Sequence, residues 1–472
     1  MSTEIIELAA LPSRRSASST APSGSFAPST PGSTGRTTVE GDEGDRPATL
    51  ADEEPPANKE AFDSYPDDAW FSCVLPCFVL FFTTIGGLYT WGVFQDALVA
   101  EGLAPASTLA WIGSTQACIE ALLAIPISRL VAAYGPRKLA LIGTLFTSLG
   151  PILAGSCTNS VGGLVVTEGI MFGLGQSLVF FAGATLPSSY FLRKRNIATG
   201  LVYAGGGLGG AVFSILAAQL LERLSLAWTF RTIGLVFLAL NLPAALVLKS
   251  RLPRVPLRGG EGKVLDWSLF KDARFTLLLL GTSIALFPLF VPPFFLPLYG
   301  SSIGLSASTS SLILAGRAGF NLASAGGRIG FGLGADALFG TLNSLVLCLA
   351  LVGVSTLAIW PVATSMAPLI VFAVINGFCA GGMFSLIPGT VASVFGTKRL
   401  GTVFSLMVSF WTPGYFMGSP IAGYLLQAFG GPEGGIAAYR PAMFYSGALS
   451  IVATGCIAGV RWKTSRRVWA KV

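Results

Sequence analysis

The feature of this 472-residue chain that most constrains its fold is a series of twelve long apolar stretches. Each is long enough to cross a bilayer as an α-helix, which takes about 20 mainly apolar residues. We therefore expect an all-α membrane protein with twelve transmembrane helices. The pair 342–362 and 367–392 is joined so closely that another division of that region is possible. The approximate ranges are 71–95, 108–129, 139–157, 163–186, 197–220, 228–248, 274–299, 308–333, 342–362, 367–392, 401–427 and 442–460.

Charged side chains are too scarce after residue 68 to cover a surface that faces water. Only 11% of the chain is charged, and 13 of its 23 acidic residues lie within residues 1–68. This first segment is rich in Ser, Thr, Pro, Gly and acids, a composition that cannot bury enough apolar surface to offset chain entropy. We expect residues 1–68 to be a disordered cytoplasmic tail. Because residues 1–11 have no apolar core of signal-peptide length, insertion depends on the first spanning helix.

Missing residue types exclude several kinds of chemistry. The chain has no histidine, which excludes imidazole catalysis and histidine-ligated metals. Its seven cysteines are scattered through apolar stretches without CxxC spacing, as buried small residues are. Neither paired catalytic carboxylates nor an activated nucleophile stands out. We expect no catalytic residue, no metal and no cofactor, so the protein is not an enzyme.

The basic residues predict which ends of the helices face the cytoplasm. Twenty of them lie at one side of the predicted helices, in the loops near 129–138, 193–195, 249–274 and 398–399 and in the tail 461–471; three lie at the other. Positively charged loops are retained in the cytoplasm, so both termini are predicted to be cytoplasmic. The net charge of +7 thus reflects membrane topology rather than nucleic-acid binding.

An internal repeat divides the chain into two halves. Phe191, Lys194 and Arg195 recur 204 positions later as Phe395, Lys398 and Arg399, and Gly173 recurs as Gly377. Two six-helix units in parallel orientation are typical of transporters in which access to a central site alternates between the two sides. The expected organisation is a tail at 1–68, bundles at 69–248 and 273–461, a cytoplasmic linker at 249–272 and a C-terminal tail at 462–472.

One of the repeated loops carries a family resemblance. The sequence YFLRKRNIATG at Tyr190–Gly200, followed by AGGGLGG at Ala204–Gly210, resembles the fifth-helix signature of the monocarboxylate-transporter-like family of the major facilitator superfamily. GVFQ at Gly92–Gln95 and AWIGS at Ala110–Ser114 look like its fungal branch, and DDAW at Asp67–Trp70 like a degraded entry motif. The resemblance covers about residues 67–460. It implies the major facilitator fold and transport of a small molecule.

The sequence also departs from this family at functional positions. Proton-coupled members carry a lysine in the first helix, where this chain has Tyr89 and Thr90, and an aspartate four residues before a helix-8 arginine, where it has Ser324 before Arg328. The loop after the second helix lacks its usual aspartate, whereas the matching loop after the eighth keeps Asp336. These departures argue against family-type proton–lactate symport while leaving the fold prediction intact.

Charged residues within the apolar stretches are the candidate site residues, because burying charge in a membrane is costly. Arg317, Asn321, Ser324 and Arg328 are spaced 4, 3 and 4 apart in the stretch 308–333. Eleven residues of helix return to within about 20°, so the four share one stripe. We expect this stripe to face a central cavity and to bind a carboxylate through its guanidinium groups.

Structural roles for the two arginines are also possible. Arg328 lies near the cytoplasmic end, where it can extend to lipid headgroups or pair with Asp336. Arg317 lies about 14 Å into the helix, which favours a cavity role, although a buried ion pair with Glu168 is an alternative.

Two acidic residues are candidates for proton coupling. Glu120 in the stretch 108–129 lies 204 positions before Ser324, so it is the equivalent residue of the first half. It should lie beside the cavity at a depth in the membrane similar to that of Ser324. Glu168 lies in the outer third of the stretch 163–186 and is the weaker candidate. A hydrogen-bonded structural role is the alternative for Glu120. The basic residues of the repeated loops are expected to anchor to lipid phosphates or to latch the halves together; they are Arg193, Lys194, Arg195, Lys398 and Arg399, and Asp336 belongs to the same conformational loop motif.

Together these features predict an alternating-access secondary transporter in the plasma membrane, acting as a monomer. Its substrate is expected to be a small organic anion, most simply a monocarboxylate or an acidic secondary metabolite, with possible coupling to protons. Uptake and export fit the sequence equally. Two alternatives are a transporter of a neutral heterocycle such as a vitamin and, in a different class, a non-transporting nutrient sensor on the same fold.

Overall fold

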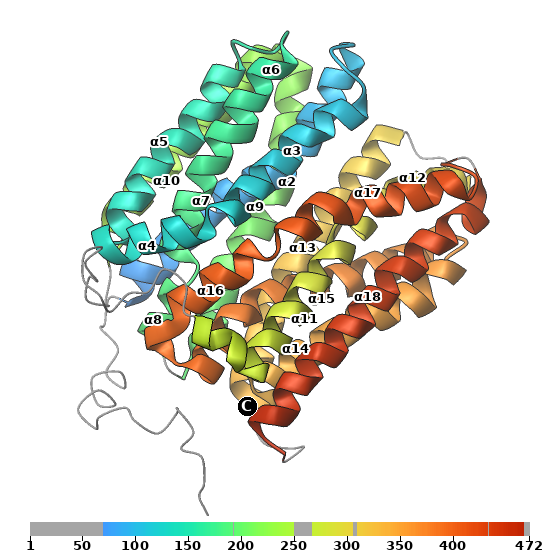
Figure 1. The fold of residues 1–472 in the computed structure, drawn as a ribbon. Helices are drawn as coiled ribbons and strands as arrows, with labels where there is room; N and C mark the ends of the chain where they lie inside the picture. Colours follow the sequence, from blue (N-terminus) through green and yellow to red (C-terminus); the bar gives the residue numbers. More distant parts are fainter. Residues whose placement is uncertain (1–68, 192, 250–266, 305–308, 433, 467–472) are drawn as a thin grey trace, which may run out of the picture. The chain divides into compact units, whose positions relative to one another are not determined.

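The computed structural model describes residues 69–191, 193–249, 267–304, 309–432 and 434–466, all within one unit, Leu50–Val472. The tail predicted at 1–68 lies outside the described residues, as do most of the predicted linker and the end of the C-terminal tail. The described residues are almost entirely helical (Figure 1). This agrees with a chain whose backbone polar groups must be satisfied without water, since only helices or closed barrels do so in lipid.

Helices of the N-terminal half coincide with the first six predicted stretches. Short helical segments continue one another within a single crossing, so that α3 and α4 form the second crossing and α6, η2, α7 and α8 the fourth. The bounds are η1 Trp70–Val74, α2 Leu75–Ala100, α3 Ala106–Leu122, α4 Ala124–Tyr134, α5 Pro136–Ala154, α6 Val161–Leu164, η2 Val165–Met171, α7 Phe172–Gly183, α8 Leu186–Tyr190, α9 Arg195–Arg223 and α10 Leu226–Val247.

The C-terminal half repeats this arrangement and coincides with the last six stretches. Its seventh crossing is interrupted between α11 and α12 next to Pro288, a residue that cannot donate a backbone hydrogen bond. The bounds are η3 Trp267–Lys271, α11 Ala273–Leu289, α12 Val291–Ser302, α13 Thr309–Gly334, η4 Ala335–Phe339, α14 Thr341–Val354, η5 Ser355–Ile359, η6 Trp360–Val362, α15 Met366–Phe395, η7 Thr397–Arg399, α16 Leu400–Ser409, α17 Thr412–Ala428 and α18 Gly435–Thr464.

Length and apolar composition identify most of these crossings independently. Among the described residues, eight helices are long and apolar enough to span a membrane, and α3 with α4, bent by 55° between them, makes a ninth. The other three predicted crossings are α5, α13 and the broken pair α16–α17. On α5, Ile142, Leu145, Leu149 and Leu153 are exposed at spacings of three or four residues, which forms one apolar face for lipid.

The internal repeat reappears in the helix starts. Pro136 and Thr341 begin α5 and α14, and Arg195 and Leu400 begin α9 and α16; both pairs are 205 positions apart, one more than the sequence offset. Before α5 and α14 stand Gly135 and Gly340, with φ of 89° and 81°. A side chain rarely adopts this backbone conformation, so glycine at the same turn of each half is required by geometry.

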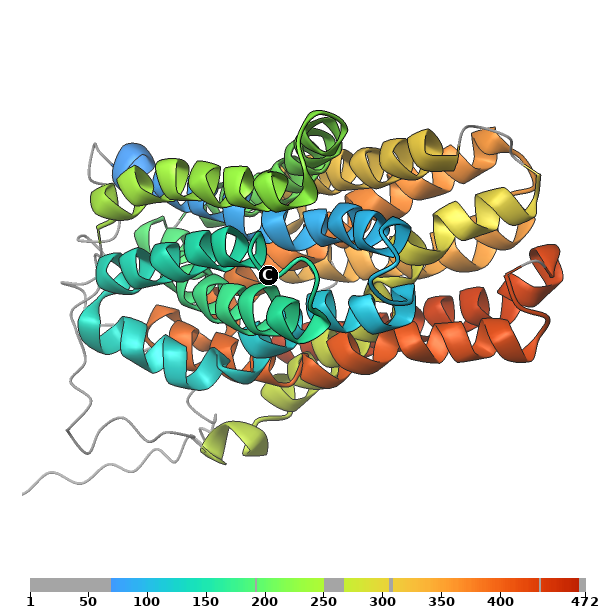
Figure 2. The same ribbon diagram turned by 90° about the horizontal axis from the view of Figure 1, so that it is seen from above.

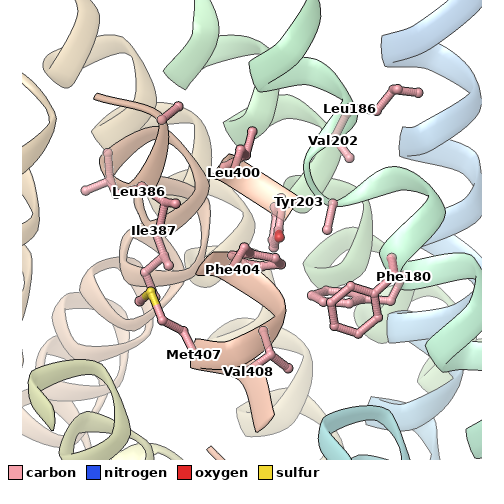
Figure 3. Close-up of a cluster of buried hydrophobic side chains, with 14 of the residues drawn as sticks. Phe180, Leu186, Val202, Tyr203, Leu386, Ile387, Leu400, Phe404, Met407 and Val408 are labelled. Atoms are coloured by element: carbon pink, nitrogen blue, oxygen red, sulfur yellow. The ribbon is translucent and has the colours of Figure 1, made fainter. Parts of the chain in front are cut away.

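The two halves contact each other closely along α9 and α13, and at the ends of α4 and α16 (Figures 1 and 2). Ser128 on α4 donates a hydrogen bond to the carbonyl of Gly401 on α16 over 3.1 Å. Side chains of α7, α8, α9, α15 and α16 form one buried apolar cluster here (Figure 3). In Figure 1, α6 and α12 lie far apart while α4 and α16 lie together, so the halves meet toward the end of the unit that carries the basic loops.

Candidate functional site

A cavity lies between the two halves. Its volume in this conformation is about 30 Å³. The N-terminal half lines it from α2, α3, α7 and α9, and the C-terminal half from the end of α11 and from α13, α15 and α17. A site shared by both halves is the place where a relative movement of the halves changes access. The lining residues are Ile85, Leu88, Tyr89, Ala117, Glu120, Gln176, Phe180, Tyr203, Phe290, Arg328, Phe384 and Tyr415.

Arg328 is the cation of this cavity. The side chain, from α13, is only 2% exposed. Its Nη1 donates to the backbone carbonyl of Tyr203, its Nη2 donates to the hydroxyl of Tyr89 over 3.2 Å, and its Cζ lies 5.9 Å from the centre of the Phe384 ring. Its Nε has no hydrogen-bond partner among the described residues. These partners are neutral, so the positive charge is held in place without being neutralised by them.

Glu120 lines the same cavity from α3. The side chain is 7% exposed, and its Oε2 accepts a hydrogen bond from Nε2 of Gln176 on α7. Ser177 donates to the backbone carbonyl of Glu120 over 3.3 Å. The carboxyl group is therefore oriented by α7 while it remains at the cavity wall. This is the placement that the repeat predicts, although a role in proton coupling stays a prediction.

The other polar residues of the predicted α13 stripe lie elsewhere. Asn321 packs on α9, where its Nδ2 lies 2.9 Å from the position a Cβ atom would take on Gly210. Ser324 is buried against Gly381 of α15. Neither is among the residues that line the cavity. Arg317 belongs to α13, but its side chain lies outside the described part of the structure.

Glu168 has a different environment from Glu120. Gln116 on α3 donates through Nε2 to the backbone carbonyl of Glu168 over 2.9 Å and to its Oε2 over 3.4 Å. Glu168 does not line the cavity. The alternative ion pair between Glu168 and Arg317 stays a prediction, because the arginine side chain is not described.

Several cavity residues were not identified from the sequence. Tyr89, Tyr203, Phe384 and Tyr415 are aromatic residues in apolar stretches, where nothing in the pattern separates a cavity wall from a lipid-facing surface. Gln176 did carry a signal, because it is an uncharged polar residue in the middle of the apolar segment FGLGQSLVFF.

Asp336 joins the two halves at the end that carries the basic loops. Its Oδ1 accepts from the side-chain Nδ2 of Asn196 over 2.7 Å and from its backbone N–H over 3.4 Å, and its Oδ2 accepts from the backbone N–H of Ile197 over 2.9 Å. The carboxylate thus caps the first turn of α9, where the helix dipole favours negative charge. Burial raises the pKa of Asp336, and these hydrogen bonds and nearby Arg195 act in the opposite direction.

The remaining basic loop residues lie in the segments before α9 and α16. Arg193 and Lys194 are exposed just before α9, and Arg399 is exposed at the end of η7. The side chain of Lys398 is not described. The sequence offered a pairing of Arg328 with Asp336 as one alternative. The contacts differ from that pairing: Asp336 accepts hydrogen bonds from α9, and Arg328 donates to Tyr203 and Tyr89.

Removing the Asp336 contact should weaken the association of the halves. Replacing Asp336 with alanine removes three accepted hydrogen bonds and should destabilise the protein by about 1–2 kcal/mol, with asparagine intermediate because it keeps one acceptor oxygen. Thermal unfolding in detergent or nanodiscs measures the effect. Replacing the exposed Glu222 with alanine is the control and should change nothing. An unfolding temperature for Asp336→Ala equal to wild type would contradict the latch.

Helices repeated in two halves around a central, partly polar cavity define a polytopic membrane protein of the transporter class. The sequence profile described as Major Facilitator Superfamily matches residues 76–336 and 278–472. The chain belongs to this superfamily. It has the major facilitator fold, and it is a multi-pass membrane transporter rather than an enzyme.

Curated relatives and solved structures agree with this assignment. The MFS-type transporter pynF of Aspergillus niger is 31% identical over 76% of this chain and 82% of its own length. The Fujikurins efflux protein of Gibberella fujikuroi is 30% identical over 83% of this chain and 85% of its own. The crystal structure of the human organic anion transporter MFSD10 has a TM-score of 0.61 at 16% identity, covering 86% of this chain and all of that one. At that identity the structural likeness shows the fold.

Proposed function

We propose that this transporter moves a small organic anion, a monocarboxylate or an acidic secondary metabolite, through the cavity between its halves by alternating access. The observation that carries the proposal is the placement of Arg328. A buried guanidinium group lines the cavity, its hydrogen-bond partners Tyr203 and Tyr89 are neutral, and its Nε is left without a partner among the described residues. A buried charge of this kind is stabilised by a charge-assisted hydrogen bond to an anion.

Export of a secondary metabolite is the direction that the relatives favour. Two similar proteins carry the names Fujikurins efflux protein and Aspyridones efflux protein apdF, the second from Emericella nidulans at 30% identity over 80% of this chain and 76% of its own. The fifth-helix signature at Tyr190–Gly200 supports placing the chain in the monocarboxylate-transporter-like branch. Arg328 is the one cationic residue among the described lining residues, and its charge suits an acidic metabolite better than a neutral vitamin.

The proposed orientation follows from the distribution of basic residues. The ends that carry the basic loops would face the cytoplasm at the plasma membrane, with both termini inside. The bundles 69–248 and 273–461 would move as two bodies joined by the linker 249–272. Contacts from Asp336 and Ser128 hold these bodies together at the basic end, which supports an outward-facing state as the one seen here.

Glu120 would carry the coupled proton. Replacing Glu120 with glutamine keeps its size and its hydrogen bonding to Gln176 but removes the titratable group. We expect exchange of substrate at equal pH to persist, while acceleration by a pH gradient is lost. Flux measured in proteoliposomes with and without the gradient checks this. Replacing Glu168, which Gln116 binds away from the cavity, with glutamine is the matched control. Loss of coupling in the Glu168 variant, with coupling intact in the Glu120 variant, would reverse the assignment.

The proposed substrate class is tested by a screen of labelled acids in proteoliposomes containing the full chain. Organic acids should exchange across the membrane, and their neutral amides should not. Transport of neutral heterocycles in place of acids would support the vitamin alternative. Absence of flux for every class, with a growth or signalling defect on deleting the gene, would support a sensor.

A further inference from the structure

The composition of the cavity wall constrains the shape of the substrate as well as its charge. Half of the twelve lining residues are aromatic. Three lining residues are aliphatic, Ile85, Leu88 and Ala117, and they all come from the N-terminal half. The six aromatic residues are Tyr89, Phe180, Tyr203, Phe290, Phe384 and Tyr415.

These rings are held by other rings. The Phe404 ring lies 6.1 Å from Phe180 and 6.2 Å from Trp411; Figure 3 shows Phe404 pointing toward Phe180. Trp411 in turn lies 6.0 Å from Phe384 and 6.5 Å from Tyr415, whose ring is 5.8 Å from Phe290. We call this connected set the aromatic arc: Phe180, Phe404, Trp411, Phe384, Tyr415 and Phe290. Packing against buried neighbours restricts the rotation of these side chains. Little conformational entropy is therefore lost when a ligand binds against the rings.

The anion site and the aromatic arc meet at Phe384. The Cζ of Arg328 is 5.9 Å from the centre of that ring, so an acid bound to the guanidinium places its carbon skeleton beside the ring. A flat, conjugated skeleton stacks on such a surface and gains more than its buried area alone provides, whereas a saturated skeleton gains only the burial.

Three of the residues that line the cavity also have a buried polar atom without a hydrogen-bond partner among the described residues. Arg328 Nε, Tyr203 Oη and Gln176 Oε1 are buried and have no hydrogen-bond partner among the described residues. Buried polar atoms normally find a partner, so these three leave hydrogen-bonding capacity in the cavity wall that a polar ligand can use. A ligand that is polar at the Arg328 side and flat beside the aromatic arc would match both features of the wall.

We propose that the substrate is a planar, conjugated organic acid whose acidic group binds Arg328 and whose ring system stacks on the aromatic arc at Phe384. This inference rests on the proposed transport of an organic anion and adds the shape and electronic character of the substrate.

The test compares two acids of equal charge and similar size, 2-naphthoate and its saturated counterpart decahydro-2-naphthoate. Binding to the full chain in nanodiscs is measured by isothermal titration calorimetry. Stacking on the Phe384 ring should make 2-naphthoate bind about tenfold more tightly. Replacing Phe384 with leucine should reduce that preference about fivefold without changing the affinity for the saturated acid. Phe290→Leu is the second variant if Phe384→Leu does not fold, and the lipid-facing Phe444→Leu is the control.

The outcomes separate this inference from the proposed function. Equal binding of the two acids, with both lost in Arg328→Gln, would overturn the preference for conjugated acids and leave anion transport standing. If neither acid binds, or if Arg328→Gln binds both as wild type does, anion binding fails and the inference fails with it.

Discussion

Replacing Arg328 with glutamine should weaken binding of the transported anion by about 10- to 150-fold, and transport should fall with it. The range corresponds to the roughly 1.5–3 kcal/mol of a hydrogen bond to a charged group. Glutamine keeps an uncharged hydrogen-bond donor on a shorter side chain, so the charge is lost. Lysine restores the charge without the planar fork and should recover only part of the affinity.

Arg231 provides the matched control for this experiment. It is also an arginine over an aromatic ring, 5.1 Å from the centre of Trp228, and it donates to the carbonyl of Gly155 over 3.3 Å. It does not line the cavity. Arg231→Gln should therefore transport as wild type does. Full anion transport by a folded Arg328→Gln variant would rule out Arg328 as the anion site.

A leucine at Gly209 should prevent the N-terminal half from folding normally. A Cβ atom on Gly209 would overlap the backbone carbonyl of Phe82 on α2, and Gly86 of α2 faces Gly209 from the other helix. Forcing two packed helices apart costs about 1–3 kcal/mol and sometimes more. We expect an unfolding temperature roughly 10 °C lower, or no monodisperse protein at all.

A variant at the neighbouring Gly207 distinguishes an effect on the relative movement of the halves from an effect on folding. A Cβ atom there would lie 2.8 Å from the carbonyl of Asn321 and 3.0 Å from Ala325 Cβ, both on α13 of the other half. Gly207→Leu should leave each half folded but disturb the contact between them, and transport should fall more than stability. Gly455→Leu is the control, since nothing lies within 4 Å of that position. Equal loss of stability in the Gly207 and Gly209 variants would contradict this division.

Much of the fold was predictable because the bilayer imposes simple rules. Each of the twelve predicted stretches coincides with a helix or a run of helical segments, since a span must be long, apolar and internally hydrogen-bonded. The count obtained from length and composition alone is lower among the described residues, because α5 has Arg137 and Lys138 in its first turn, α13 carries polar residues within its span and α16–α17 is interrupted.

The candidate site was predictable only in part. Glu120 lines the cavity, as the repeat suggested, and Arg328 lines it, as the stripe on 308–333 suggested, whereas Glu168, Asn321 and Ser324 lie outside it. Whether any of them binds substrate or protons stays a prediction. The aromatic wall was invisible in the sequence, because an aromatic residue in an apolar stretch suits lipid, a core or a ligand equally well.

The sequence by itself determined the solvent this protein folds in, its helical spans and its twofold repeat, since these follow from local composition and period. Only the tertiary structure decided which polar residues of α13 reach the cavity. Ser324 and Arg328 are four residues apart, about 40° around the helix. That small rotation is enough to move a side chain from the contact with α15 to the space between the halves, and no periodicity in α13 specifies where its neighbours α9 and α15 will lie.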